Sequence, residues 1–120
     1  MLQPISWLIL AAIHAAPAFA FFRPATLATL YGLAADNPLF LLMHHRAALF
    51  VAVFTACLYA AFVPDGRRLA CIVVGISMGS FLILYWHAGQ PTALRRIAIV
   101  DLAGLPFLAL AAFLAFRPAA

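Results

Sequence analysis

The chain has 120 residues, of which 68% are hydrophobic and 8% are charged, and its formal net charge is +4. Soluble domains carry about a quarter charged residues, so this composition excludes a water-soluble globular protein. A membrane-spanning helix needs roughly 20 mostly apolar residues, and the chain contains four such runs. We therefore predict a single membrane domain over residues 1–120, with an all-α fold: an antiparallel bundle of four transmembrane helices.

The first apolar run predicts a span over residues 5–22. Pro17 interrupts this run and cannot donate a helical hydrogen bond, so the helix either ends there or bends and continues to Phe22. Trp7 lies near the start of the span, where an aromatic side chain is typical of the membrane interface. Residues 25–33 then predict a short helical segment at the interface.

The other three spans are predicted at residues 38–62, 67–87 and 93–116. Val63 to Gly66 contains Pro, Asp and Gly in the order of a tight turn, so the second and third spans should be antiparallel neighbours. The third span also contains Gly75 and Gly79 at G-x-x-x-G spacing. Small residues at this spacing let helix backbones approach closely, so we expect this face to lie inside the bundle.

Two opposite charges inside the spans are the main indication of a functional site. Charge at membrane depth is costly unless it faces a partner or a wet cavity. Counted from Pro38 and Thr92, where the spans start, Arg46 and Asp101 lie about 12 and 14 Å into the membrane from the same side. Asp101 is the only acid within a predicted span. We therefore predict that Arg46 and Asp101 form a charge-assisted pair.

The histidines lie in the same half of the predicted bundle as this pair. Successive helical residues are about 100° apart, so His44, His45 and Arg46 cannot all face inward. One interpretation is a polar pocket, on the side away from the termini, for a ligand, a metal or a proton. The other is an internal lock between Arg46 and Asp101, with the histidines at the interface. The candidate pocket residues are His14, His44, His45, Arg46, Ser80, His87 and Asp101.

Motifs for catalysis and for cofactors are lacking in the sequence. A glycine-rich phosphate loop and a strand pattern are both missing, so we expect no enzyme activity and no catalytic residues. Metal ligands cannot be assigned, because no His-x-x-x-His occurs, and no cofactor is predicted. A haem site with two histidine ligands remains an alternative only if His14 pairs with His44 or His45. The arginines are divided between both sides of the membrane, which argues against a nucleic-acid partner.

Short motifs along nearly the whole chain suggest a family. They are His14 and Pro17 in the first span, Leu30-Tyr31-Gly32-Leu33, Asn37-Pro38, His45-Arg46-Ala47, Leu49-Phe50, and Arg96 to Asp101-Leu102. With these motifs the chain resembles a family of small, four-span bacterial inner-membrane proteins of uncharacterised function. Some members bear the name phosphopantetheine adenylyltransferase. That enzyme is a soluble α/β nucleotide-binding protein, and this sequence lacks its phosphate site and its fold.

We interpret the protein as an integral membrane protein of the lipid bilayer that acts as a binding or accessory component, for example in assembly. We expect it to form a homo-oligomer or to belong to a larger membrane complex. A lipid-, quinone- or haem-binding bundle is the first alternative, and a proton-coupled channel or transporter acting as an oligomer is the second. The resemblance implies a multi-pass protein of the bacterial inner membrane. Three arginines flank the spans on each side, so the positive-inside rule gives no orientation. We predict cytoplasmic termini.

Overall fold

The structure, a computed structural model, describes residues 2–118. Its helices are α1 (Leu2–Phe19), α2 (Thr26–Tyr31), α3 (Phe40–Phe62), α4 (Arg67–His87) and α5 (Arg95–Phe116), with 3-10 turns η1 (Pro64–Gly66) and η2 (Thr92–Leu94). No strand occurs among these residues. Four of the helices are long and apolar enough to cross a membrane. The predicted all-α, four-helix membrane bundle is therefore confirmed.

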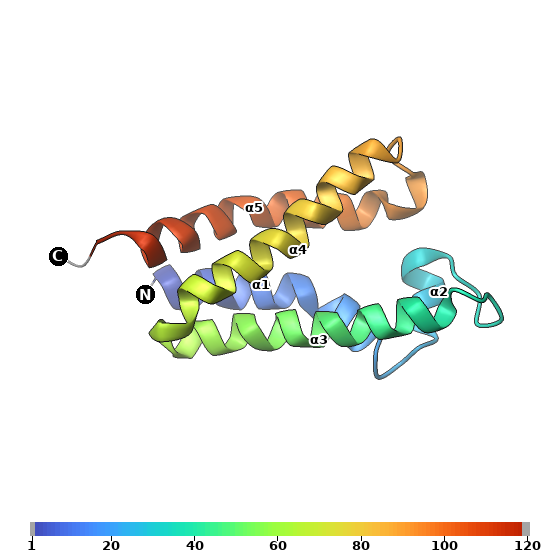
Figure 1. The fold of residues 1–120 in the computed structure, drawn as a ribbon, viewed down its shortest axis with the longest axis horizontal. Coiled ribbons are helices and arrows are strands. Elements are labelled where there is room, and N and C mark those ends of the chain that lie inside the picture. Colours follow the sequence, from blue (N-terminus) through green and yellow to red (C-terminus); the bar gives the residue numbers. More distant parts are fainter. Residues whose placement is uncertain (1, 119–120) are drawn as a thin grey trace.

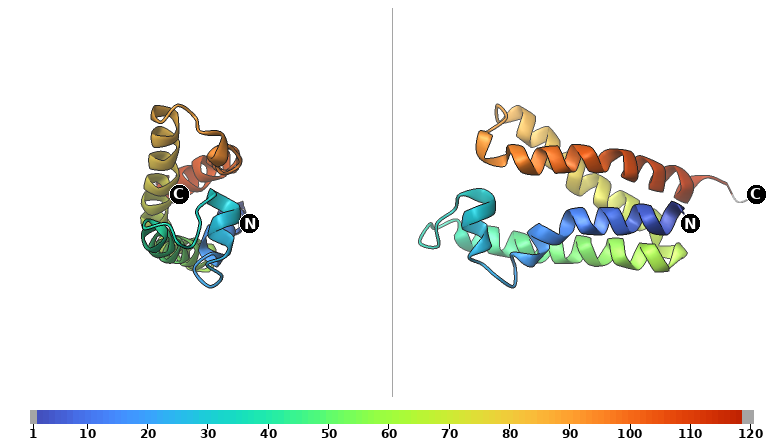
Figure 2. Two further views of the ribbon diagram at one scale, coloured as in Figure 1. Left: turned by 90° about the vertical axis from the view of Figure 1, so that its right-hand side faces the viewer. Right: turned by 180° about the vertical axis from the view of Figure 1, so that it is seen from behind.

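The four long helices form a ring in the order α1, α3, α4, α5, and each packs against its two neighbours in that ring. Figure 2 shows α1 lying between α3 and α5. The helices α3 and α5 are therefore diagonal to each other. Both termini lie at one end of the bundle, and α2 and residues 88–94 lie at the other, which we call the far end (Figure 1). Both α3 and α5 begin at the far end.

The outer faces of the long helices carry large apolar side chains. Leu41 on α3 is 74% exposed, Ile76 on α4 is 65% exposed and Phe113 on α5 is 68% exposed. A water-soluble protein rarely exposes apolar surface on this scale. In a bilayer these side chains contact acyl chains, which agrees with a multi-pass membrane protein.

The size of the side chains between α3 and α4 changes along their length. Near η1 the two helices meet through small buried residues: Cys57, Ala60, Ala61, Ala70 and Cys71. Both cysteines are free. Toward the far end bulkier residues take their place, with Phe50 on α3 and Phe81 and Tyr85 on α4. The helices diverge accordingly, and α4 runs away from α3 toward His87 (Figure 1).

The first span differs from the prediction at both ends. Helix α1 starts at Leu2, runs through Pro17 and ends at Phe19, so it neither stops at the proline nor reaches Phe22. Trp7 is fully buried in the core rather than at the membrane interface. With the earlier start, Trp7 lies more than one turn inside the helix, in the core cluster that it forms with residues of α3, α4 and α5. The short helix predicted within residues 25–33 is present as α2.

The G-x-x-x-G prediction is wrong. A Cβ added at Gly75 or Gly79 would meet no atom within 4 Å, so this face of α4 is open rather than packed. The close approach occurs instead at Gly104 on α5, where an added Cβ would lie 2.7 Å from Ile13 Cδ1 and 2.8 Å from Met78 Cε. On α4 the close contact is made by Met78, whereas the positions of the two glycines meet no neighbouring side chain.

Candidate functional site

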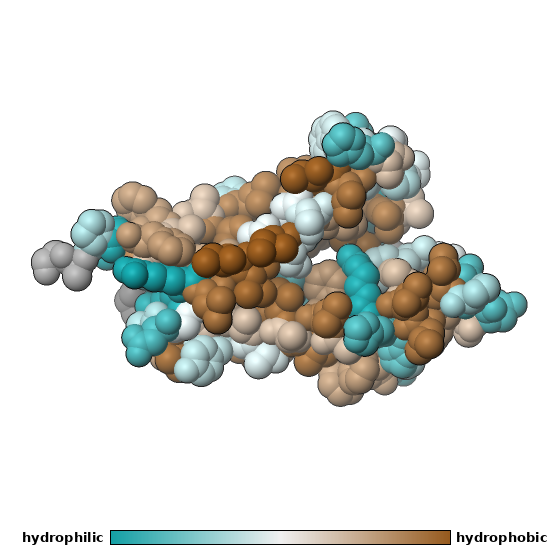
Figure 3. All heavy atoms as spheres, in the orientation of Figure 1, coloured by the Kyte–Doolittle hydropathy of each residue, from teal (hydrophilic) through white to brown (hydrophobic). Residues whose placement is uncertain are grey.

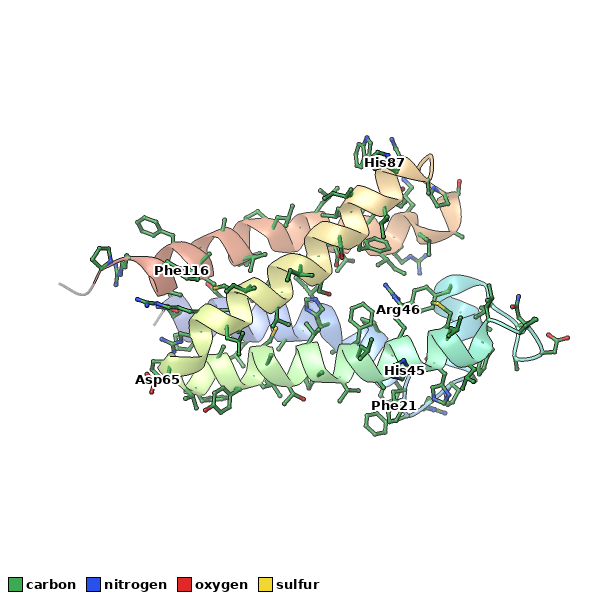
Figure 4. The ribbon with its side chains drawn as sticks, viewed as in Figure 1. Phe21, His45, Arg46, Asp65, His87 and Phe116 are labelled. Atoms are coloured by element: carbon green, nitrogen blue, oxygen red, sulfur yellow. The ribbon has the colours of Figure 1, made fainter. Side chains whose placement is uncertain are left out.

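Arg46 lies on a continuous stripe of α3. Arg46, Phe50, Val53 and Cys57 are three or four residues apart and so share one helix face. Near η1 this face packs on α4 through Cys57. At the level of Arg46, six residues after the start of α3 and thus about 9 Å into the helix, α4 has already diverged. Figure 4 shows Arg46 pointing from α3 into the space between α3 and α4.

The contacts of Arg46 are aromatic. Its Nη1 donates a hydrogen bond to the Tyr31 hydroxyl at 3.1 Å. Its guanidinium carbon lies 4.6 Å from the ring centroid of Phe50 and 5.5 Å from that of Tyr31, which are cation–π distances. Tyr31 is held by α2, whose buried Leu27 packs against Ala47 of α3. A guanidinium has five N–H donors, and this is its one side-chain hydrogen bond among the described residues.

A small inner cavity of about 160 Å³ brings together residues from α1, α3 and α5. Its charged or titratable lining residues are His14, Arg46, Arg96 and Asp101, and Tyr31, Phe50 and Phe81 add aromatic walls. Asp101 is six residues after the start of α5, so its depth matches that of Arg46, as predicted.

The predicted direct pair between Arg46 and Asp101 requires a correction. No ion pair joins them among residues 2–118, and the hydrogen bond of the guanidinium goes to Tyr31 instead. The physical reason is the order of the helices. Arg46 is on α3 and Asp101 is on α5, and these two helices are diagonal across the ring. The two charges therefore share a cavity without pairing.

His14 is the one predicted histidine that lines the inner cavity. It is 2% exposed, and its Nδ1 donates a hydrogen bond to the Leu10 carbonyl at 2.8 Å. This hydrogen bond fixes the proton on Nδ1 in the neutral ring, so Nε2 is left as an acceptor. The Phe50 ring lies beside it, with 6.1 Å between the ring centroids.

The other predicted residues lie outside the inner cavity, although Ser80 lines a groove between α3 and α4. His44 donates from Nε2 to the Phe21 carbonyl at 2.9 Å and packs beside the Phe21 ring. His45 and His87 are exposed, and His87 is at the far tip of α4 (Figure 4). Ser80 is exposed and donates to the Ser77 carbonyl at 3.3 Å. Neither His44 nor His45 shares the inner cavity with His14, so the bis-histidine haem pair is not assembled.

Two larger hollows adjoin the inner cavity. A far-end cleft of about 540 Å³ lies between α2, α3, α4 and residues 88–94, and its walls include Tyr31, Met43 and Tyr85. A groove of about 370 Å³ runs between α3 and α4. Arg46 and Phe81 line all three hollows, so the hollows meet at these two residues. Figure 3 shows the resulting notch in the far-end half of the molecule.

Four lining residues were missed as site residues by the sequence analysis: Tyr31, Phe50, Phe81 and Arg96. Helical spacing could have identified two of them. Phe50 is four residues after Arg46 on the same face, and Tyr31 is four residues after the buried Leu27. Nothing in the sequence places Phe81 or Arg96, because their position depends on how α4 and α5 pack.

The arginines at the opposite end have structural roles. Arg67 donates to the carbonyls of Ala60 and Ala61 at 2.8 and 3.2 Å, and Arg68 donates to that of Ala115 at 3.1 Å. These carbonyls belong to the last turns of α3 and α5, where helical acceptors lack partners and cations are favoured. Among residues 2–118, no three His, Cys, Asp or Glu side chains converge on a metal site.

Comparisons of the chain with protein-family models, with curated proteins and with solved structures find no match. The resemblance to small four-span bacterial proteins therefore stays a prediction.

Proposed function

We propose that this protein is a membrane-embedded binding protein for an amphiphile, which it takes from the bilayer through the groove between α3 and α4. The polar end of the amphiphile is at Arg46 and its hydrocarbon lies along the groove. The observation that carries the proposal is the position of Arg46, a cation six residues into α3, where an apolar groove, a cleft and a polar inner cavity meet.

The groove has the lining that a hydrocarbon chain requires. Leu49, Ile76 and Leu84 line it and are 56%, 65% and 67% exposed, so it faces the acyl chains directly. Its lining on α3 extends from Arg46 to Val53, which is about 10 Å of helix. An amphiphile in the bilayer can therefore enter sideways without crossing water.

The packing of the other half of the bundle supports binding rather than conduction by a single copy. Between the inner cavity and the end of the bundle that carries the termini, the core contains Trp7, Leu10, Val74 and Met78, all fully buried. The side chains at the site also favour binding over catalysis, because the donor groups of Ser80 and His14 are held by backbone carbonyls. A role as an accessory subunit remains compatible with this function, because a bound amphiphile can also join two membrane proteins.

The test compares two bulky substitutions on neighbouring residues of α4. The purified protein is extracted with organic solvent and its co-purified amphiphiles are quantified by mass spectrometry. Ser80→Phe fills the groove and should remove the bound species. Gly79→Phe adds the same bulk on an open face outside the groove and should leave it in place. Equal amounts in both variants, or no amphiphile in the wild type, would contradict the proposal.

We further propose that the protein is located in a bacterial inner membrane with cytoplasmic termini, so that the far end faces the periplasm. The resemblance to the bacterial family supports this location. Alkaline phosphatase, which is active only outside the cytoplasm, provides the test as a fusion partner. A fusion after Gln90 should be active and a fusion after Arg117 inactive. The reverse pattern would invert the orientation.

A further inference from the structure

The charge of the residues that line the groove between α3 and α4 and the adjoining hollows indicates which class of amphiphile binds there. Arg46 is the one charged residue among those that line the groove and the far-end cleft, whereas Asp101 and the exposed Arg96 line only the inner cavity. Asp101 makes no ion pair with Arg46 among residues 2–118. A cation within a span is stable only if an anion, a dipole or water compensates it, and Tyr31 is a neutral partner.

The guanidinium of Arg46 has donors available for an anion. It offers five N–H groups in a planar fork, a geometry that matches phosphate and carboxylate oxygens. Phe50 and Tyr31 pack near the guanidinium and limit its orientation, so its fork is held at the junction of the groove and the cleft. A neutral head such as a quinone carbonyl would accept a hydrogen bond but would leave the positive charge uncompensated.

From this charge complementarity we infer that the bound amphiphile is an anionic phospholipid, with its phosphate at Arg46 and one acyl chain in the groove between α3 and α4. This inference rests on the proposed function. Arg46 is close to the far-end interface, at about 9 Å along α3, so a lipid phosphate reaches it with little displacement from the headgroup layer. The 540 Å³ cleft beside Arg46 opens at that end and accommodates the rest of the headgroup.

The test measures the preference between two lipids with identical chains. The protein is reconstituted in nanodiscs that contain equal amounts of dioleoylphosphatidylglycerol and dioleoylphosphatidylcholine. It is then released, and the lipids that it retains are identified by native mass spectrometry. Both lipids offer a phosphate to Arg46, but in the zwitterionic lipid the choline cation offsets the phosphate charge. We therefore expect the anionic lipid to be retained about tenfold more, a difference of about 1.4 kcal/mol. Arg46→Gln should abolish this preference, whereas Arg46→Lys, which keeps the charge, should retain part of it.

The matched control is Arg95→Gln. Arg95 is an exposed arginine at the same end of the bundle and lines none of the three hollows. Its substitution should leave the lipid preference unchanged. If Arg95→Gln reduced the preference as much as Arg46→Gln, general surface charge would be responsible and the inference would be overturned.

Three other outcomes show which of the two proposals fails. Equal retention of both lipids, with loss of both in Ser80→Phe, would overturn the anionic class and keep the amphiphile site. Loss of the retained anionic lipid on addition of inorganic phosphate would show that the head alone is recognised, and it would overturn the assignment to a lipid. Absence of any lipid that responds to Ser80→Phe would overturn both proposals.

Discussion

Tyr31→Phe tests whether the structure assigns the correct partner to Arg46. The substitution removes only the hydroxyl that accepts the 3.1 Å hydrogen bond from Arg46 Nη1, and it keeps the ring beneath the guanidinium. Hydrogen bonds to charged groups contribute about 1.5–3 kcal/mol to stability. Both side chains are half-buried and the hydrogen bond is long, so we expect a loss near the lower limit, about 1.5 kcal/mol in the free energy of unfolding.

The assay is titration with sodium dodecyl sulfate in mixed micelles, followed by far-ultraviolet circular dichroism. In an Arg46→Met background the same Tyr31→Phe substitution should cost less than about 0.5 kcal/mol, because the donor is already absent. Tyr59→Phe is the control, since Tyr59 is 56% exposed and has no side-chain hydrogen bond in the described part of the chain. An equal cost of Tyr31→Phe in both backgrounds would refute the assigned partner.

Three further predictions use the same assay. Asp101→Asn should lower the free energy of unfolding by about 1–2 kcal/mol, because Asp101 shares a cavity with Arg46 but does not pair with it. Breaking a buried ion pair costs about 3–5 kcal/mol, so a loss in that range would show that the two side chains meet. Gly104→Ala should lower stability by about 1 kcal/mol, because the added methyl group would overpack against Ile13 and Met78. Gly79→Ala meets no neighbour and should raise stability by up to about 1 kcal/mol, because Ala favours the helix more than Gly does. Changes of the opposite sign would contradict the assigned packing. Trp7→Phe should lower the free energy of unfolding by less than about 1 kcal/mol, because the buried indole N–H has no partner among residues 2–118. Trp7→Ala should lower it by about 3–5 kcal/mol, because it leaves a cavity in the core. Similar losses in both variants would show that Trp7 does not act mainly through packing.

Features that depend on local sequence were predictable. Hydropathy and turn residues located the spans, and the bounds of α4 were predicted at both ends because a Pro-Asp-Gly turn precedes it and a Gly-Gln-Pro turn follows it. The equal depth of Arg46 and Asp101 was also predictable, because it depends only on the helical rise from two starts at the same end.

The order of the helices around the bundle was not predictable. About twenty residues join α1 to α3, and a connection of that length does not specify which helices become neighbours. That order makes α3 and α5 diagonal, and so it decides that Arg46 and Asp101 share a cavity without contact. It also decides that Gly104, rather than Gly75 and Gly79, receives neighbouring side chains.

The inward histidine could not be selected from α3 alone. His44 and His45 are about 100° apart on the helix, and the sequence gives no reason to prefer either. In the structure Ala20 and Leu27 pack against Ala47 of α3, and the buried histidine is His14 of α1, whose ring lies beside Phe50. His44 turns to the Phe21 carbonyl.

The same two helices stabilise the fold at one end and form the candidate site at the other. Small residues such as Cys57 and Ala70 let α3 and α4 pack closely near η1, whereas at the far end the two helices have diverged and Phe81 and Tyr85 line the cleft between them. A charge cannot be buried in the close-packed half without a partner, but in the open half it can reach a headgroup or water. Substitutions around Arg46 should therefore alter what is bound more than they alter folding, while those around Cys57 should weaken both.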